Sequence, residues 1–241
     1  MERDAPEEQL SLMGGADVSD LVQIGDPVRR QEERGCDQPD GLSPMDPPDA
    51  YAPPGETGGD DADLGKRHPY LRALTDDHAR LMEAMALLEE KLAKVREAGF
   101  TADVDVAVMR FLETFDREFI AHSREEEARL FPLLHERLIA DGEHSKGRVI
   151  TTAIDVMKDE HLKAVQLAAV VLNLMRLGTV LPDERSADLV IKAALGELKK
   201  LVELLRLHIF REDGIVFARA QGLIALAELD AMGAAGRRRD S

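Results

Sequence analysis

Two pairs of residues in the sequence have the chemistry and the spacing of metal ligands. His122 is followed four residues later by Glu126, and His208 is followed four residues later by Glu212. Residues four apart lie on the same face of an α-helix, about 6 Å apart along its axis. Large apolar residues precede each pair at helical spacing, so the pattern aims both carboxylates at a protein core. A buried carboxylate without a cation is costly, and a bound metal ion removes that cost.

Two further histidines, His78 and His161, interrupt apolar stripes of the same kind, so that each of four stripes carries one histidine. We expect all four stripes to be buried. Their members are Leu71, Leu74, His78, Leu81, Met85, Leu88 and Leu92; Val108, Phe111, Phe115, Phe119, His122, Glu126 and Leu130; Ile150, Ile154, Met157, His161, Val165, Ala168 and Leu172; and Ile191, Leu198, Leu201, Leu205, His208, Glu212 and Ile215. No lysine or arginine falls on these stripes near the histidines to balance the two carboxylates.

A single histidine on an apolar helix face is more often an ordinary core residue than a ligand. Four histidines and two glutamates, with one histidine per stripe and a repeated order, favour a metal site instead. Two carboxylates that reach between the ions, with two imidazoles for each ion, would hold a pair of ions about 3.5–4 Å apart. Mixed imidazole and carboxylate ligands suit iron or manganese, and zinc could replace them on ligand type alone. We expect iron ahead of manganese or zinc.

The remaining polar residues near these positions are given lesser roles. Three histidines lie off the stripes and are predicted not to be ligands: His68, His135 and His144. Asp77, Asp159 and Glu160 could accept hydrogen bonds from imidazole N–H groups. A solvated helix face is the simpler interpretation of these three acidic residues.

The elements that must position the site are helical from His68 onward, because the apolar residues follow helical period and proline is nearly absent. We expect helices at 69–97, 103–140, 147–178 and 184–221, and a short final helix near 224–233. Strand-like alternation is absent, so the pattern predicts an all-α protein, an antiparallel up-down four-helix bundle. The motif DDHARL at 76–81 recurs as DEHLKA at 159–164, and both His-x-x-x-Glu pairs have a phenylalanine nine residues after the histidine. Two similar helix hairpins would therefore meet about a pseudo-twofold axis, with the six polar residues at the centre.

The first 67 residues follow different rules. They contain 8 of the 11 prolines and 9 of the 18 glycines, and 17 acidic residues against 6 basic ones. Such a segment buries too little apolar surface to offset chain entropy, so residues 1–67 are predicted to be a disordered acidic extension. A more apolar stretch at 10–25 is either a short docking motif for a protein partner or a chance feature of the extension. The bundle is expected at 68–235, followed by a basic tail at 236–241.

Composition excludes several classes of protein. The formal net charge of −16 argues against nucleic-acid partners and against adhesion to anionic membranes. We expect no apolar run to approach the roughly 20 residues that span a bilayer, and no secretory signal is expected at the acidic N-terminus, which lacks an apolar core region. The single cysteine, Cys36, excludes a disulfide framework and a cysteine-ligated cluster. We expect a cytoplasmic protein without a membrane partner.

The motifs around His78, HSREEEARLFP at 122–132, DEH at 159–161 and HIFREDGIVF at 208–217 resemble the hemerythrin-like family of HHE cation-binding domains. The resemblance covers about residues 68–235. It implies a non-haem di-iron centre with an oxo or hydroxo bridge, bound by His78, His122, Glu126, His161, His208 and Glu212. The rival ferritin-like bundles use Glu-x-x-His pairs, and this sequence contains none.

The sequence departs from the oxygen-carrying hemerythrins at two positions. Those proteins have a fifth histidine four residues after that of the third helix, and Val165 stands at that position here. They also have an aspartate five residues after the last histidine. Asp213 has that spacing, but Glu212 matches Glu126 in the repeat and is preferred as the ligand. Fewer imidazoles leave more metal positions open, which favours reactivity over reversible oxygen storage.

Three functions are compatible with these residues. The first is a di-iron protein that binds or reacts with O2, nitric oxide or peroxide in sensing, detoxification or oxidative-stress defence, whether or not it is an enzyme. Its dry pocket would be lined by Phe111, Phe115, Phe119, Leu81 and Leu205. The second is an iron-handling, iron-donating or ferroxidase-like protein, and the third is a regulatory module whose metal state is reported through residues 1–67. The iron-centre-repair branch of the family carries adjacent cysteines in an N-terminal module, and the lone Cys36 does not match it.

Overall fold

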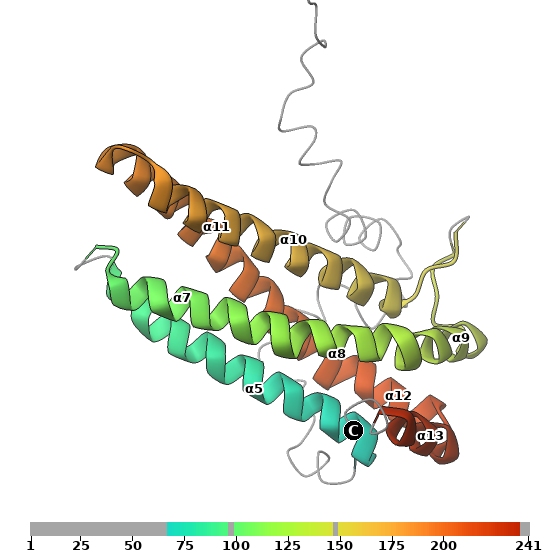
Figure 1. The fold of residues 1–241 in the computed structure, drawn as a ribbon. Helices are drawn as coiled ribbons and strands as arrows, with labels where there is room; N and C mark the ends of the chain where they lie inside the picture. Colours follow the sequence, from blue (N-terminus) through green and yellow to red (C-terminus); the bar gives the residue numbers. More distant parts are fainter. Residues whose placement is uncertain (1–66, 96–98, 147–148, 237–241) are drawn as a thin grey trace, which may run out of the picture.

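The computed structural model describes residues 67–95, 99–146 and 149–236, and every regular element among them is helical. The helices run antiparallel in an up-down bundle (Figure 1), which confirms the predicted fold class. In chain order the elements are α5 (Pro69–Leu92), α7 (Ala102–Thr114), η1 (Phe115–Phe119), α8 (Ile120–Glu125), η2 (Glu126–Leu130), α9 (Phe131–Asp141), α10 (Ala153–Val180), α11 (Glu184–Arg211), η3 (Glu212–Val216), α12 (Phe217–Leu223) and α13 (Leu226–Gly236). The predicted docking motif at 10–25 lies outside the described residues, as do the extension apart from Arg67 and the tail apart from Gly236.

Four long helices form the bundle. The first is α5, the second is the continuous run α7–η1–α8–η2–α9, the third is α10, and the fourth is the continuous run α11–η3–α12. The short helix α13 folds back beside the start of α5 at one end of the bundle, and the turn between α10 and α11 lies at the other end (Figure 1). The prediction of a short fifth helix is therefore confirmed, two residues later in the chain than expected.

Local capping explains where several helices begin and end. The side chain of Thr152 accepts a hydrogen bond from the Ile154 N–H, and the Asp155 carboxylate accepts one from the Thr152 N–H. This capping box makes α10 begin at Ala153, six residues later than predicted. Asp183 caps α11 in a similar way, and Gly142, at φ 87°, ends α9. Helix α5 ends at Leu92, earlier than the predicted residue 97.

Three π-helical turns interrupt the second and fourth helices, and the sequence analysis did not predict them. They are η1, η2 and η3, and the last two begin at Glu126 and Glu212. Val104 and Leu138 are 34 residues apart on the second helix. At 3.6 residues per turn this is about 9.4 turns, which would put Val104 and Leu138 on nearly opposite sides of a regular helix. Each π-turn takes up one extra residue. With two residues taken up, about 8.9 turns remain, so both residues face the core, where both are buried.

The core consists of two apolar clusters with the polar residues between them. On one side lie Leu81, Phe111, Phe119, Ala164 and Leu205 with their neighbours, and the five residues predicted to line a dry pocket belong to this cluster. The other cluster includes Leu71, Leu74, Leu130, Met157 and Phe217. Along every bundle helix the histidine falls where one cluster ends and the other begins. The site is therefore a polar layer across the middle of an apolar bundle.

The predicted third stripe is partly wrong. Ile154, Met157, His161 and Ala168 are buried, whereas Ile150, Val165 and Leu172 are between 42% and 48% exposed. Ile150 precedes α10, which begins at Ala153. Val165 and Leu172 each directly follow a buried residue, Ala164 and Val171, and consecutive residues point about 100° apart around a helix. The buried side of α10 instead continues through Ala164, Val171 and Met175. An apolar outer face is left on this helix.

One described helix, α10, is long and apolar enough by length and composition to cross a membrane. Its best 18-residue window has a mean hydropathy of 1.3, so the expectation that no apolar stretch approaches membrane-spanning length needs correction here. A core helix of a bundle passes the same test, and α10 directs His161 into the bundle interior. The absence of a membrane partner stays a prediction.

Candidate metal centre

The fold brings together all six residues that were predicted to bind metal. The four imidazoles come from the four bundle helices, and the two carboxylates stand at the first residues of the π-turns η2 and η3. None of the six is more than 4% exposed, and both glutamates are completely buried. The Nε2 atoms of His78 and His122 lie 3.0 Å apart. The side chains thus converge on a common centre from every side of the bundle.

Glu212 lies at the middle of this centre. Its Oε2 atom is 3.0 Å from Nε2 of His78 and 3.2 Å from Nε2 of His208, and its Oε1 atom is 3.9 Å from Nε2 of His161. Two groups of potential ligands share this carboxylate, His78 with His122 and His161 with His208. In each group the ligand atoms lie within 4.8 Å of one another.

Glu126 joins the same two groups from the opposite helix. Its Oε2 atom lies 3.3 Å from Nε2 of His122 and 3.4 Å from Nε2 of His161. One imidazole of each group is therefore in reach of Glu126, and both groups are in reach of Glu212. Two carboxylates between two pairs of imidazoles is the arrangement that the repeated His-x-x-x-Glu motif predicted.

The chemistry of the buried atoms fits a bound cation. The short contacts between the carboxylates and the imidazoles lack hydrogen-bond geometry, so both oxygens of Glu126 and of Glu212 remain without a hydrogen-bond partner. The Nε2 atoms of His161 and His208 are also unpartnered. Unpaired buried lone pairs are costly. Their convergence on shared positions is the arrangement that metal ions satisfy.

Carboxylates lie behind the imidazoles, at the ring nitrogens that point away from the centre. Nδ1 of His122 is 3.4 Å from Asp77, Nδ1 of His161 is 2.8 Å from Glu127, and Nδ1 of His208 is 3.0 Å from Glu160. Nδ1 of His78 lies 3.2 Å from Oδ1 of Asp213, although the contact is poorly aligned for a hydrogen bond. Such contacts hold the proton on Nδ1 and leave Nε2 free to bind a metal.

Two of these partners correct the sequence analysis. Glu160 does not lie on a solvated face, because it is only 1% exposed and also forms an ion pair with the buried guanidinium of Arg211. A basic residue, Arg211, is therefore present one position before Glu212, and it forms an ion pair with Glu160. Glu127 was not singled out at all, and its signal is its place next to Glu126 on a helix that faces α10.

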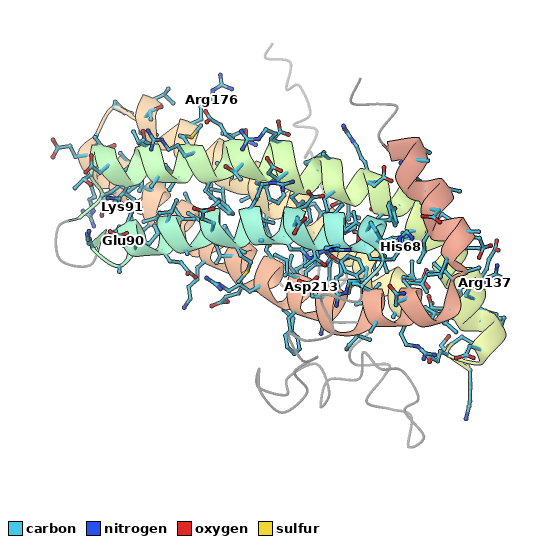
Figure 2. The ribbon with its side chains drawn as sticks, turned by 90° about the horizontal axis from the view of Figure 1, so that it is seen from below. His68, Glu90, Lys91, Arg137, Arg176 and Asp213 are labelled. Carbon is cyan, nitrogen blue, oxygen red and sulfur yellow. The ribbon has the colours of Figure 1, made fainter. Side chains whose placement is uncertain are left out.

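Glu212 and Asp213 occupy different positions relative to the imidazoles, and these positions favour Glu212 as the ligand. Glu212 is completely buried and approaches all four imidazoles, whereas Asp213 is 29% exposed at its side chain and lies behind His78. Asp213 also accepts a hydrogen bond from the Thr75 hydroxyl at 3.1 Å, and its backbone carbonyl accepts one from Arg67 at 2.8 Å. In Figure 2 it is labelled beside α5. Asp213 is thus in a position to hold the ring of His78 in place.

Charge within the layer changes the acidity of its members in the metal-free protein. Burial by itself lowers the pKa of His208, but the charges of Glu212 and Glu160 outweigh it and raise this pKa to about 10. Burial also lowers the pKa values of His78, His122 and His161. The nearby carboxylates outweigh this effect, so that all three pKa values are raised. Burial would raise the pKa of Glu212, but the imidazoles, above all that of His208, hold it well below its usual range. In the metal-free protein the carboxylates therefore favour the protonated form of the imidazoles.

Aromatic rings close the layer on both sides. Phe131 stacks on His161 and Phe217 stacks on His78, with ring centroids 5.6 Å apart in both cases. Phe119 meets His161 and His208 edge-on from the opposite cluster. Phe119 was predicted to line the pocket, whereas Phe131 and Phe217 were noticed only as members of the repeat. These rings exclude water and limit the space to small molecules.

The other histidines lie away from the centre. His68 caps α5 and contacts Asp230, Nδ1 of His135 lies 2.8 Å from the Thr152 hydroxyl, and His144 contacts the Ser145 carbonyl. The position predicted to correspond to a fifth histidine, Val165, is 42% exposed on the outer face of α10. Met157, one turn before His161, and Ile154 are the completely buried residues of that stripe.

The fold and the site together define a four-helix bundle with a buried, metal-binding layer of histidines and glutamates. A family model for the hemerythrin HHE cation-binding domain matches residues 70–220. The chain belongs to this family, which confirms the resemblance of its motifs. No curated protein and no solved structure matches the chain in the comparisons made.

Proposed function

We propose that the chain is a non-haem di-iron protein that binds or reacts with O2, nitric oxide or peroxide. The observation that carries this proposal is the sharing of two buried, hydrogen-bond-free carboxylates by two pairs of imidazoles. A single ion would use only part of this set. Two ions would use all of it, and the imidazole and carboxylate ligands suit iron.

The residues divide between the two positions. His78 and His122 would hold one ion, His161 and His208 would hold the other, and Glu126 and Glu212 would reach both. Two bound iron ions would supply electron transfer to a small ligand and positions for it to bind. The chain supplies fewer ligands than two six-coordinate ions need, so some positions stay open.

The surroundings select the ligand. Phe119, Phe131 and Phe217 pack directly against the imidazoles, and apolar clusters lie on both sides of the layer. Such walls favour small molecules with little or no charge over large or ionic substrates. This favours O2, nitric oxide and peroxide as ligands.

The test is the metal content and the optical spectrum of anaerobically loaded protein, before and after addition of O2, nitric oxide or peroxide. We expect about two irons per chain and new absorption bands on exposure. His122→Ala and His208→Ala should each lose iron and the bands. His135→Ala is the matched control, because this half-buried histidine lies on the same bundle helix as His122 but outside the centre.

Two results would contradict the proposal. A chain that retains no iron after loading, with unchanged folding in both alanine variants, would remove the site. Iron that is bound but passes at once to a weak chelator, without any spectral response to the three ligands, would favour an iron-handling protein instead.

A further inference from the structure

The outer face of α10 differs from the other outer faces of the bundle. Between residues 162 and 180 the helix carries no acidic residue, Arg176 is exposed, and Lys163 is half-buried. Six large apolar residues on this face are between 42% and 69% exposed: Leu162, Val165, Val170, Leu172, Leu177 and Val180. At 1.5 Å per residue the face is about 27 Å long. We call it the α10 face.

The neighbouring helices do not share this character. The outer face of α11 carries Lys192, Lys199, Lys200 and Glu203, and most of these charges form ion pairs along the helix. The outer face of α5 carries Arg72, Asp76, Arg80, Glu83 and Glu90. The α10 face also carries the exposed polar residues Gln166 and Asn173. Six exposed large apolar residues without an acidic neighbour on one face of a charged protein still mark an interaction surface.

We propose that a second copy of this chain covers the α10 face. The two α10 helices would pack antiparallel about a twofold axis near Ala169, a small exposed residue halfway along the face. One helix face that pairs with itself makes a closed interface, so no third copy is recruited.

Charge favours this occupant and this orientation. A chain with a net charge of −16 repels its own copies, and the least repulsion is met where the surface carries no acidic groups. In a parallel pair the two Arg176 side chains would meet. In an antiparallel pair about Ala169 they lie roughly 20 Å apart along the axis, at opposite ends of the interface. Figure 2 shows Arg176 projecting beyond the ribbons.

The position of the chain ends also favours a second copy over a segment of the same chain. Arg67, where residues 1–66 join the bundle, contacts Asp213, and α13 lies beside the start of α5. Both chain ends therefore join at one end of the bundle, whereas the α10 face runs from the middle to the other end (Figure 1). A second copy needs no segment to reach across the bundle.

The size of the face sets the expected strength. A standard interface takes about 20–30 residues from each partner, whereas the α10 face exposes about half as many. We expect a reversible dimer whose dissociation constant is on the order of micromolar, visible as a concentration-dependent mass in solution.

The experiment is sedimentation velocity on the full chain between about 1 and 100 μM. Leu172→Glu and Val165→Glu should each weaken the dimer at least tenfold, because each buries a carboxylate in an apolar interface. Leu87→Glu is the matched control, since Leu87 is 60% exposed on the outer face of α5. Helical content and iron binding should be the same in all three variants.

A second measurement tests the axis. In a Cys36→Ser background, Ala169→Cys should form a disulfide between two copies under mild oxidation, whereas Leu87→Cys should not. A monomer at every concentration would overturn the proposal, and so would a dimer that both α10 variants leave intact. Monomer that binds phosphatidylcholine vesicles through this face would also overturn it, in favour of a membrane surface. Since sedimentation and disulfide formation do not depend on iron, their failure leaves the metal proposal untouched.

Discussion

Glu160 and Arg211 form a buried ion pair directly behind His208, and this pair links the stability of the fold to the metal centre. The two side chains are each 1% exposed, and the Glu160 carboxylate also accepts the hydrogen bond from Nδ1 of His208. Removing one charge from a buried pair leaves the other charge uncompensated. The pair therefore has two separable effects, one on folding and one on the imidazole.

We expect Glu160→Gln to lower the free energy of unfolding of the metal-free protein by about 3–5 kcal/mol, because the buried Arg211 guanidinium loses its ion pair with Glu160. The same change should weaken iron binding about 10–100-fold, because His208 loses the carboxylate that orients it. Chemical denaturation and anaerobic Fe(II) titration measure the two effects. The double variant Glu160→Gln/Arg211→Met should recover much of the stability but not the affinity. Unchanged affinity in both variants would show that Glu160 does not position His208.

The raised histidine pKa values predict two opposite trends as the pH rises: the metal-free protein becomes less stable, and its affinity for iron increases. His208 has a pKa of about 10 in the folded protein, against about 6.5 unfolded. A raised pKa contributes stability that is fully present below pH 6.5 and is lost as the pH rises towards 10. The melting temperature of metal-free protein should therefore fall between pH 6.5 and 9.

Metal loading must displace these protons, so the affinity for iron should rise over the same pH range. Calorimetric titration in buffers of different ionisation enthalpy would count the released protons. Loading without proton release would contradict the protonated state of the metal-free imidazoles.

At the scale of the elements, the π-turns η2 and η3 place the two carboxylates and also change what the next residues tolerate. Pro132 follows η2 inside a continuous helix, where a proline ordinarily costs about 3 kcal/mol. The Phe131 N–H already donates to the Glu126 carbonyl five residues back, and the matching Phe217 N–H donates to the Glu212 carbonyl. The repeat thus offers the same backbone environment at Ala218 as at Pro132.

We expect Ala218→Pro to cost less than about 1.5 kcal/mol of unfolding free energy, well below the cost of proline in a regular helix. Ala193→Pro is the control, because Ala193 is exposed in the regular interior of α11 and should cost about 3 kcal/mol or more. Denaturant unfolding of both variants measures the difference. Equal costs would mean that η3 does not relieve the helix in the way that η2 does.

At the scale of the whole molecule, the described bundle supplies all six residues of the metal centre and the carboxylates behind the imidazoles. Among the described residues, those that contact the imidazoles, including the carboxylates behind them, lie between Thr75 and Phe217, and Arg67 also contacts this network. A protein shortened to residues 67–241 should therefore bind the same amount of iron as the full chain. Iron analysis and thermal melting check this, and both proteins should melt at a higher temperature when loaded. Loss of iron on truncation would instead assign residues 1–66 a direct role at the site.

Much of the site could be predicted because its information is local. A spacing of four residues puts His122 above Glu126 and His208 above Glu212 in any helix. The repeat then implies that the two hairpins present these residues alike. The same local reasoning predicted four bundle helices, although a capping box at Thr152 moved the start of α10.

Contacts between helices could not be predicted in this way, since spacing along one helix does not determine what packs against it. Only the packing of α10 on α11 decided that Glu160 is buried against Arg211 and not solvated. Val165 and Leu172 were assigned to the core from period alone, and the true phase of α10 turned them outward. The π-turns likewise escaped prediction, because an inserted residue shows only when buried positions far apart on one helix are compared. The sequence by itself therefore determined which side chains could meet a metal, and tertiary structure decided which side chains hold them there.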